Sequence, residues 1–283
     1  MQKIKDLIKK YIQIFFHQTP LNEICLNIYA DNLYNSKRFQ DEKRLLKYEY
    51  TVFSQYGEDG IIHEIFKRIG TTNKYFIEFG GNDGSYNNST NLLLNGWTGL
   101  WIEADLKMIK TAENIFEKYI KSEHLKIKNS FVTVDNIESI FKEYSVPPEF
   151  DFLSIDIDFN DYYSWKAIKS FKPRVLVIEY NASLGPDNAF VVPYNEKSGW
   201  DGKTNAYGAS LKALERLGIE KGYSLVACSS TGQNAFFVRN DMIKDNFFPP
   251  FTSENHFEPP RYCLVYKKNG HLKKIADYVS LSS

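Results

Sequence analysis

Three aspartates at short spacing end the stretch FDFLSIDIDFND, which runs from Phe150 to Asp161. Its apolar residues predict a strand, and because side chains alternate along a strand, Asp156 and Asp158 are expected on the same face. Two carboxylates on one face are costly to bury, so they indicate a cation, a proton donor or a polar substrate nearby. The spacing suits either a divalent metal held through oxygen ligands or a general base. Alternatively, one aspartate only caps the helix expected over 162–171.

A second group of polar residues lies in YFIEFGGNDGSYNNSTNLLLNGWTGLWIEAD, from Tyr75 to Asp105. One apolar run ends at Gly80 and Gly81, a polar turn follows, and a second apolar run ends on the carboxylate of Glu103. Strand, glycine turn, helix, strand and acid, in this order, are typical of a nucleotide-binding site at the carboxyl edge of a parallel sheet. The glycines let the backbone approach a ligand, and the carboxylate can accept hydrogen bonds from both ribose hydroxyls.

Two further polar segments precede predicted helices. Ser54–Gly60 comes before a helix whose apolar face ends at Gly70. Its backbone amides and acids suit either the binding of an amino-acid head group or plain capping, with Glu58 or Asp59 in the first turn. Asp135 begins a sequence with the spacing of a capping box, so we predict a helix N-cap there rather than a ligand contact.

The elements that carry these residues alternate along the chain. Helices are expected between successive strands until the last two strands, which join directly as a hairpin. This alternation predicts an α/β fold with a doubly wound, seven-stranded, mostly parallel sheet and one antiparallel strand in the C-terminal hairpin. The expected strands lie near residues 75–80, 99–103, 126–133, 150–158, 174–180, 223–229 and 234–240.

The chain of 283 residues fits one large domain with an extension. Residues 1–50 are expected to form a helical extension, because apolar residues recur at helical spacing between Ile4 and Phe15. Residues 51–283 would form the main domain. Within it, 182–204 is predicted to be a long loop that acts as a lid or substrate wall, and 240–260 a loop that wraps over the domain. Residues 261–268 are predicted to add an edge strand.

The composition excludes several classes of protein. Lys plus Arg and Asp plus Glu number 35 each, so no net field draws the chain to nucleic acid or an anionic membrane. The basic, apolar start is too short for a transmembrane segment and lacks a cleavage site, which favours a helix packed on the domain or at a homo-oligomer contact. Cys25, Cys228 and Cys263 have no metal-type spacing and cannot all pair, which favours a reduced, cytoplasmic protein.

Taken together, five segments resemble the FkbM-like family of class I S-adenosylmethionine-dependent methyltransferases. They are SQYGEDG (54–60), FIEFGGNDG (76–84), WIEAD (101–105), DFLSIDIDFND (151–161) and VIEYN (177–181). The resemblance spans roughly 53–239 and implies a Rossmann-like methyltransferase fold, S-adenosyl-L-methionine as cofactor, and O-methylation of a sugar or related small metabolite. A non-catalytic cofactor-binding module of the same fold is one alternative. A nicotinamide-dependent oxidoreductase is another, although Gly80, Gly81 and Gly84 do not fit its G-x-G-x-x-G spacing.

The resemblance also implies roles for individual residues. Eight of them would bind the cofactor: Gln55, Asp59, Glu78, Gly80, Gly84, Glu103, Ser130 and Phe131. Gln55 and Asp59 would close over the cofactor. The turn on its methionine side would be formed by Glu78, Gly80 and Gly84. Glu103 would hold the ribose, and Ser130 and Phe131 would lie beside the adenine. Asp156 and Asp158 would face the reacting methyl group. Asp158 would take the proton of the acceptor hydroxyl, unless Mg²⁺ or Mn²⁺ bound by both aspartates lowers the pKa of that hydroxyl instead.

Overall fold

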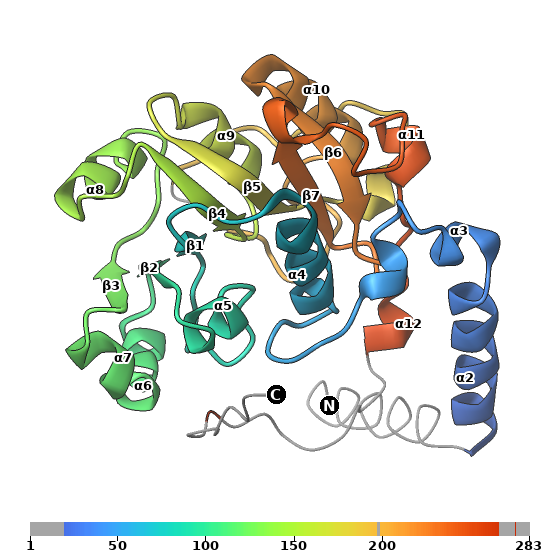
Figure 1. Ribbon diagram of the computed structural model, residues 1–283, viewed down its shortest axis with the longest axis horizontal. Coiled ribbons are helices and arrows are strands. Elements are labelled where there is room, and N and C mark those ends of the chain that lie inside the picture. The colour runs from blue at the N-terminus through green and yellow to red at the C-terminus, as the bar shows by residue number, and fades with distance from the viewer. Residues whose placement is uncertain (1–19, 197–198, 266–274, 276–283) are drawn as a thin grey trace, which may run out of the picture.

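The computed structural model describes residues 20–196, 199–265 and 275 (Figure 1). The helix predicted between Ile4 and Phe15 lies outside these residues. Within the described part of the chain, no helix is both long enough and apolar enough to cross a membrane.

Seven strands form one sheet in the order β3-β2-β1-β4-β5-β7-β6. The first five strands pair in parallel, and β7 pairs antiparallel with both β5 and β6. This confirms the predicted fold class, including the single antiparallel strand in the terminal hairpin. The strands are β1 (Tyr75–Phe79), β2 (Thr98–Glu103), β3 (Leu125–Asn129), β4 (Glu149–Ile155), β5 (Lys172–Glu179), β6 (Tyr223–Cys228) and β7 (Asn234–Arg239).

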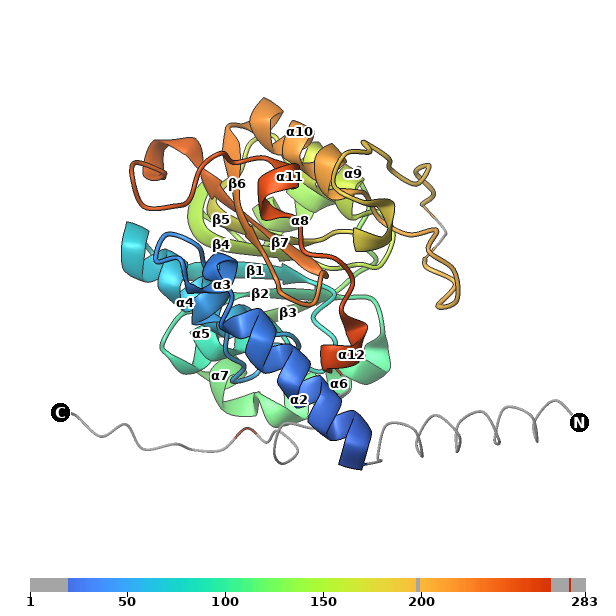
Figure 2. The same cartoon turned by 90° about the vertical axis from the view of Figure 1, so that its right-hand side faces the viewer.

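Helices cover both faces of the sheet, which Figure 2 shows between two helical layers. One layer contains α8 (Ile137–Glu143), α9 (Asp161–Ala167) and α10 (Leu211–Lys221). The other contains α4 (Glu58–Ile69), α5 (Thr90–Leu94), α6 (Leu106–Ile115) and α7 (Glu117–Lys121). Because both faces are covered, most residues of the central strands are apolar and buried on both sides of the sheet. In β4, for example, Leu153 packs into the first layer and its neighbour Phe152 into the second, and both are fully buried.

Two local predictions are wrong. Asp135 is not the N-cap of α8, because the helix begins at Ile137 and Asn136 occupies the N-cap position, where its side chain accepts a hydrogen bond from the backbone N–H of Thr133 at 2.9 Å. Residues 261–268 do not begin as an edge strand. They begin as a short helix, α12 (Tyr262–Val265), because Arg261 ties this segment to the turn between β6 and β7 rather than to a sheet edge.

The described part of the N-terminal extension packs against the C-terminal tail. It contains α2 (Pro20–Tyr34), α3 (Lys37–Gln40) and the 3-10 helix η1 (Leu46–Tyr48), and α2 lies beside α12 (Figures 1 and 2). The buried carboxylate of Glu258, just after α11 (Ser253–His256), forms ion pairs of 2.7 Å with both Arg38 and Arg261. The proposed boundary at residue 50 therefore divides two segments that hold each other in place.

Glu49 lies at the end of this extension, and the raised pKa of its carboxyl group predicts that the stability of the protein depends on pH. Burial, together with the charges of Glu58 and Glu258, raises this pKa to about 8, although the backbone N–H of Ser230 opposes the shift by donating to the carboxylate at 2.6 Å. A raised folded-state pKa stabilises the protein fully below the unfolded value of 4.5, and this stabilisation is lost as the pH rises through about 8. We expect Glu49→Gln to remove up to about 2 kcal/mol of the fall in unfolding free energy between pH 6 and pH 9.

Urea unfolding at both pH values measures this effect. Glu113→Gln, which replaces an exposed carboxylate on α6, is the control and should unfold with the pH dependence of the wild type. An unchanged pH dependence in Glu49→Gln would show that Glu49 titrates normally in the folded protein.

Candidate active site

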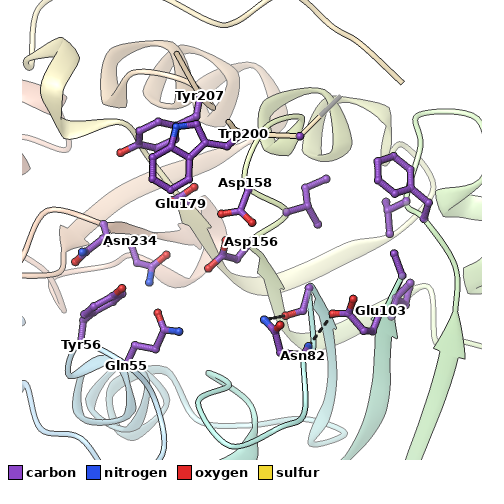
Figure 3. A pocket seen from close by; sticks show the side chains of 18 of the residues that line it. Gln55, Tyr56, Asn82, Glu103, Asp156, Asp158, Glu179, Trp200, Tyr207 and Asn234 are labelled. Carbon is purple, nitrogen blue, oxygen red and sulfur yellow. Dashed lines mark hydrogen bonds between the residues drawn. The ribbon is translucent and has the colours of Figure 1, made fainter. Parts of the chain in front are cut away.

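A cavity of about 690 Å³ opens at the carboxyl edge of the parallel strands (Figure 3). Strand order reverses between β1 and β4, and in doubly wound sheets ligands bind in the crevice outside such a reversal. The cavity lies there, since Gly80 after β1 and Asp156 after β4 both line it. A smaller cavity of about 260 Å³ adjoins it and shares five lining residues: Gln55, Gly80, Asn82, Asp156 and Asn234.

The glycine turn after β1 requires glycine for two different reasons. Gly80 has φ +70°, and a Cβ atom there would lie 1.9 Å from the backbone oxygen of Asp156. Only glycine therefore lets the loops after β1 and β4 approach each other at the cavity floor. Gly84, with φ +81°, lies against the rings of Trp101 and Phe116, and it lines neither cavity. Its role here is to let the loop pack on these rings.

Glu103, the last residue of β2, connects the glycine turn to the next loop. One of its carboxylate oxygens accepts the backbone N–H of Asn82 and the other accepts that of Asp105, each at 2.8 Å. Each oxygen retains a lone pair, and the side chain lines the larger cavity. Ser130 and Phe131 line the same cavity beyond β3, with Phe131 about 50% exposed. The structure thus brings these three predicted cofactor residues to one wall.

Glu78, in β1, is buried and holds the loop that leads into α5. Its carboxylate accepts the backbone N–H groups of Asn88 and Ser89, each at 2.9 Å, and the Ser89 hydroxyl. Burial raises its pKa to about 7, and these hydrogen bonds oppose the shift. Glu78 lines only the smaller cavity, so the structure places it beneath the turn rather than against the larger cavity.

Gln55 and Asp59 lie before and within the start of α4, but in different positions. Gln55 is exposed and lines both cavities. Asp59 is buried and lines neither: one of its oxygens accepts three backbone N–H groups, from residues 52 to 54, and the hydroxyl of Ser54. Asp59 therefore shapes the loop that presents Gln55, and the structure does not bring it to the cavity.

The aspartates after β4 meet a third carboxylate. β4 ends at Ile155, so Asp156 and Asp158 lie in a loop, and the expectation that strand alternation orients them is wrong. Asp158 instead has a left-handed backbone, with φ +64°. Even so, the side chains of Asp156, Asp158 and Glu179 converge, and each offers an oxygen within 4.8 Å of the others. We call these three residues the carboxylate cluster. Glu179 is the last residue of β5, and β5 lies next to β4 in the sheet. Its place at the end of a strand that neighbours β4 predicts that it lies near the two aspartates.

Burial and mutual repulsion disfavour the charged forms of this cluster. Both effects raise the pKa values of Asp156 and Glu179 well above their usual range. Burial, and then the charge of Glu103, raises the pKa of Asp158. The third aspartate of the motif, Asp161, is fully buried as the first residue of α9, and it accepts the backbone N–H of Ile157 at 2.8 Å. It fixes the loop that carries the cluster, and it does not line either cavity.

An aromatic wall, formed by Tyr56, Trp200, Tyr207 and Tyr262, also lines the larger cavity. The rings of Trp200 and Tyr207 lie 5.1 Å apart, and Figure 3 shows them above Asp158 and Glu179. The Trp200 indole N–H donates to the backbone oxygen of Thr204 at 2.6 Å, which holds the ring. Trp200 lies in the loop predicted as a lid, whereas no local pattern predicts that Tyr207 reaches the cavity, since only the fold brings it there.

Comparison with known proteins identifies similarity of structure only. No protein-family model and no curated protein sequence matches the chain. Among solved structures, the chain is similar to a methyltransferase from Aquifex aeolicus (12% identity over 65% of this chain and 88% of that chain, TM-score 0.39). It is also similar to an S-adenosylmethionine-dependent methyltransferase from Clostridium acetobutylicum ATCC 824 (13% identity over 76% of this chain and 99% of that chain, TM-score 0.41). A third similar structure is the magnesium protoporphyrin IX methyltransferase from Synechocystis PCC 6803 with bound SAM (13% identity over 82% of this chain and 96% of that chain, TM-score 0.42).

The sheet order and the closing antiparallel hairpin are those of the class I S-adenosylmethionine-dependent methyltransferase fold. Fold alone does not define an activity, so the function has to be inferred from the cavity and the residues that line it.

Proposed function

We propose that this protein is an FkbM-like, S-adenosylmethionine-dependent O-methyltransferase that acts on a hydroxyl of a sugar or related small metabolite. One observation carries the proposal: the glycine turn, Glu103 and the carboxylate cluster all open into a single cavity where the strand order reverses. We further propose that it works in the cytoplasm, in keeping with the free thiols of Cys25, Cys228 and Cys263.

The two cavities suit the two ends of the proposed cofactor. Glu103 would accept the ribose hydroxyls through its remaining lone pairs, and the adenine would lie beside Ser130 and Phe131 in the loop after β3. The methionine part would pass Gly80 into the smaller cavity. There, the side-chain amide nitrogen of Asn87 is buried and has no hydrogen-bond acceptor, so a carboxylate placed nearby would satisfy it.

The chemistry left to the protein is alignment and proton transfer. S-adenosylmethionine, when bound, supplies an activated methyl group. The aromatic wall would hold the flat face of a sugar ring and direct its hydroxyl for in-line displacement. Asp158 is the proposed base, because a carboxylate with a raised pKa accepts a proton more readily. In a second mechanism, Asp156 and Asp158 would hold a divalent cation, which would lower the pKa of the hydroxyl instead.

Calorimetric titration with S-adenosylhomocysteine tests the cofactor assignment. We expect the wild-type protein to bind this product and not NAD. Glu103→Gln is expected to weaken binding about 10- to 100-fold, because a charge-assisted hydrogen bond contributes about 1.5–3 kcal/mol. Glu113→Gln, on the exposed side of α6, should bind like the wild type. Binding of NAD with no binding of S-adenosylhomocysteine would support an oxidoreductase and exclude the proposal.

A screen for methyl transfer to sugars and sugar nucleotides then addresses the acceptor. Binding of S-adenosylhomocysteine without transfer to any hydroxyl compound would favour the non-catalytic binding module.

A further inference from the structure

The spacing within the carboxylate cluster fits one metal ion. Asp156, Asp158 and Glu179 come from two neighbouring strand ends, and one oxygen of each lies within 4.8 Å of the others. Around a single Mg²⁺, Mn²⁺ or Ca²⁺ ion, with metal–oxygen distances of about 2.0–2.6 Å, neighbouring ligand oxygens are about 3 Å apart and opposite ones about 4–5 Å apart. All three separations are therefore within the range that ligands of one ion can have.

A second observation is that two carboxylate oxygens, one within the cluster and one beside it, lack hydrogen-bond partners. One oxygen of Glu179 is shielded from solvent and has no hydrogen-bond partner. The same is true of one oxygen of Asp161, a fully buried side chain whose charge acts on Asp156. Among the residues that the structure describes, no basic side chain forms an ion pair with any member of the cluster. Buried carboxylates without a cation or a donor are costly, so these oxygens are suited to a positively charged ligand.

We propose that Asp156, Asp158 and Glu179 bind one divalent cation of the Mg²⁺ or Mn²⁺ type. This proposal rests on the proposed function and deepens it. There the cation belongs to one of two mechanisms and Glu179 has no role; here Glu179 is a third ligand. An octahedral ion with three carboxylate ligands keeps three positions for water or substrate oxygens. A substrate oxygen would reach these positions from the larger cavity, which the cluster lines together with Trp200 and Tyr207. The acceptor hydroxyl would thus bind the ion directly and lose its proton more readily.

Titration of the full-length protein with Mn²⁺, followed by the electron paramagnetic resonance signal of the free ion, counts the sites without any methyl acceptor. The wild type is expected to bind one Mn²⁺ that excess Mg²⁺ displaces. Glu179→Gln, which keeps the shape of the side chain and removes its charge, is expected to weaken binding at least 10-fold. Glu196→Gln is the matched control, since it removes an exposed carboxylate from the loop that carries Trp200 and should leave Mn²⁺ binding unchanged.

Absence of stoichiometric Mn²⁺ binding by the wild type, with and without S-adenosylhomocysteine, would overturn the site. Equal binding by wild type and Glu179→Gln would overturn the assignment of Glu179. If Glu179→Gln does not fold, as judged by circular dichroism, Asp158→Asn at the exposed member of the cluster is expected to show the same loss. Mn²⁺ binding without S-adenosylhomocysteine binding would retain the cation site and reject the methyltransferase, so the two proposals fail separately.

Discussion

The Gly80→Ala variant is expected to bind S-adenosylhomocysteine at least about 100-fold more weakly than the wild type. The new Cβ atom would lie 1.9 Å from the backbone oxygen of Asp156, so the loops after β1 and β4 must separate. These loops form the floor of the cavity between Glu103 and the carboxylate cluster. A misplacement of about 1 Å in an active site is enough to reduce the reaction rate about 100-fold, and we expect a loss of affinity of the same order here. A left-handed backbone at alanine adds about 1–2 kcal/mol of strain.

Gly96→Ala separates the two effects. Gly96 has φ +80°, so alanine there carries the same kind of strain, but a Cβ atom would have no neighbour within 4 Å. We expect Gly96→Ala to lose about 1–2 kcal/mol of unfolding free energy and to bind S-adenosylhomocysteine normally. Calorimetry and urea unfolding of both variants measure the two quantities. Wild-type affinity in Gly80→Ala would mean that the ligand does not depend on the contact between these loops.

The order of the elements was predictable because it depends on local pattern. Short apolar runs predict strands, and the segments with helical periodicity between them predict the helices of a doubly wound sheet. In such a sheet, the carboxyl ends of neighbouring parallel strands meet at one edge. This is why Gly80, Glu103 and Asp156 are found at one cavity. The same logic, applied to Glu179 at the end of β5, identifies the third member of the carboxylate cluster.

The orientation of individual side chains was not predictable, because it depends on which hydrogen bonds the loops need. Asp59 and Glu78 resemble ligand contacts in sequence, yet both carboxylates accept several backbone N–H groups of their own loops. Gly84 similarly fits a ligand-binding motif, and the structure uses it to pack against Trp101. Tyr207 reaches the cavity through a long loop whose path no local pattern specifies.

A buried ion pair joins β4 and β5 at the edge of the sheet opposite the cavity. We expect a large loss of stability when this ion pair is broken. Arg174 in β5 donates to Asp151 in β4 at 2.6 Å, and its guanidinium also donates to the backbone oxygens of Ile69 and Gly70 at the end of α4. The Asp151 side chain is fully buried and that of Arg174 is 8% exposed. Arg174→Met would leave the carboxylate of Asp151 buried without its cation, which costs about 3–5 kcal/mol.

Urea unfolding of Arg174→Met measures this loss, and Lys128→Met, which breaks an ion pair with Glu143 at the surface, should cost far less because solvent screens that pair. The double variant Arg174→Met with Asp151→Asn is expected to lose less than the sum of the single variants, because removing both charges leaves no uncompensated buried charge. Additive losses would show that the two side chains stabilise the sheet independently. Because the pair lies at the amino ends of β4 and β5, the fraction that remains folded should bind S-adenosylhomocysteine with wild-type affinity.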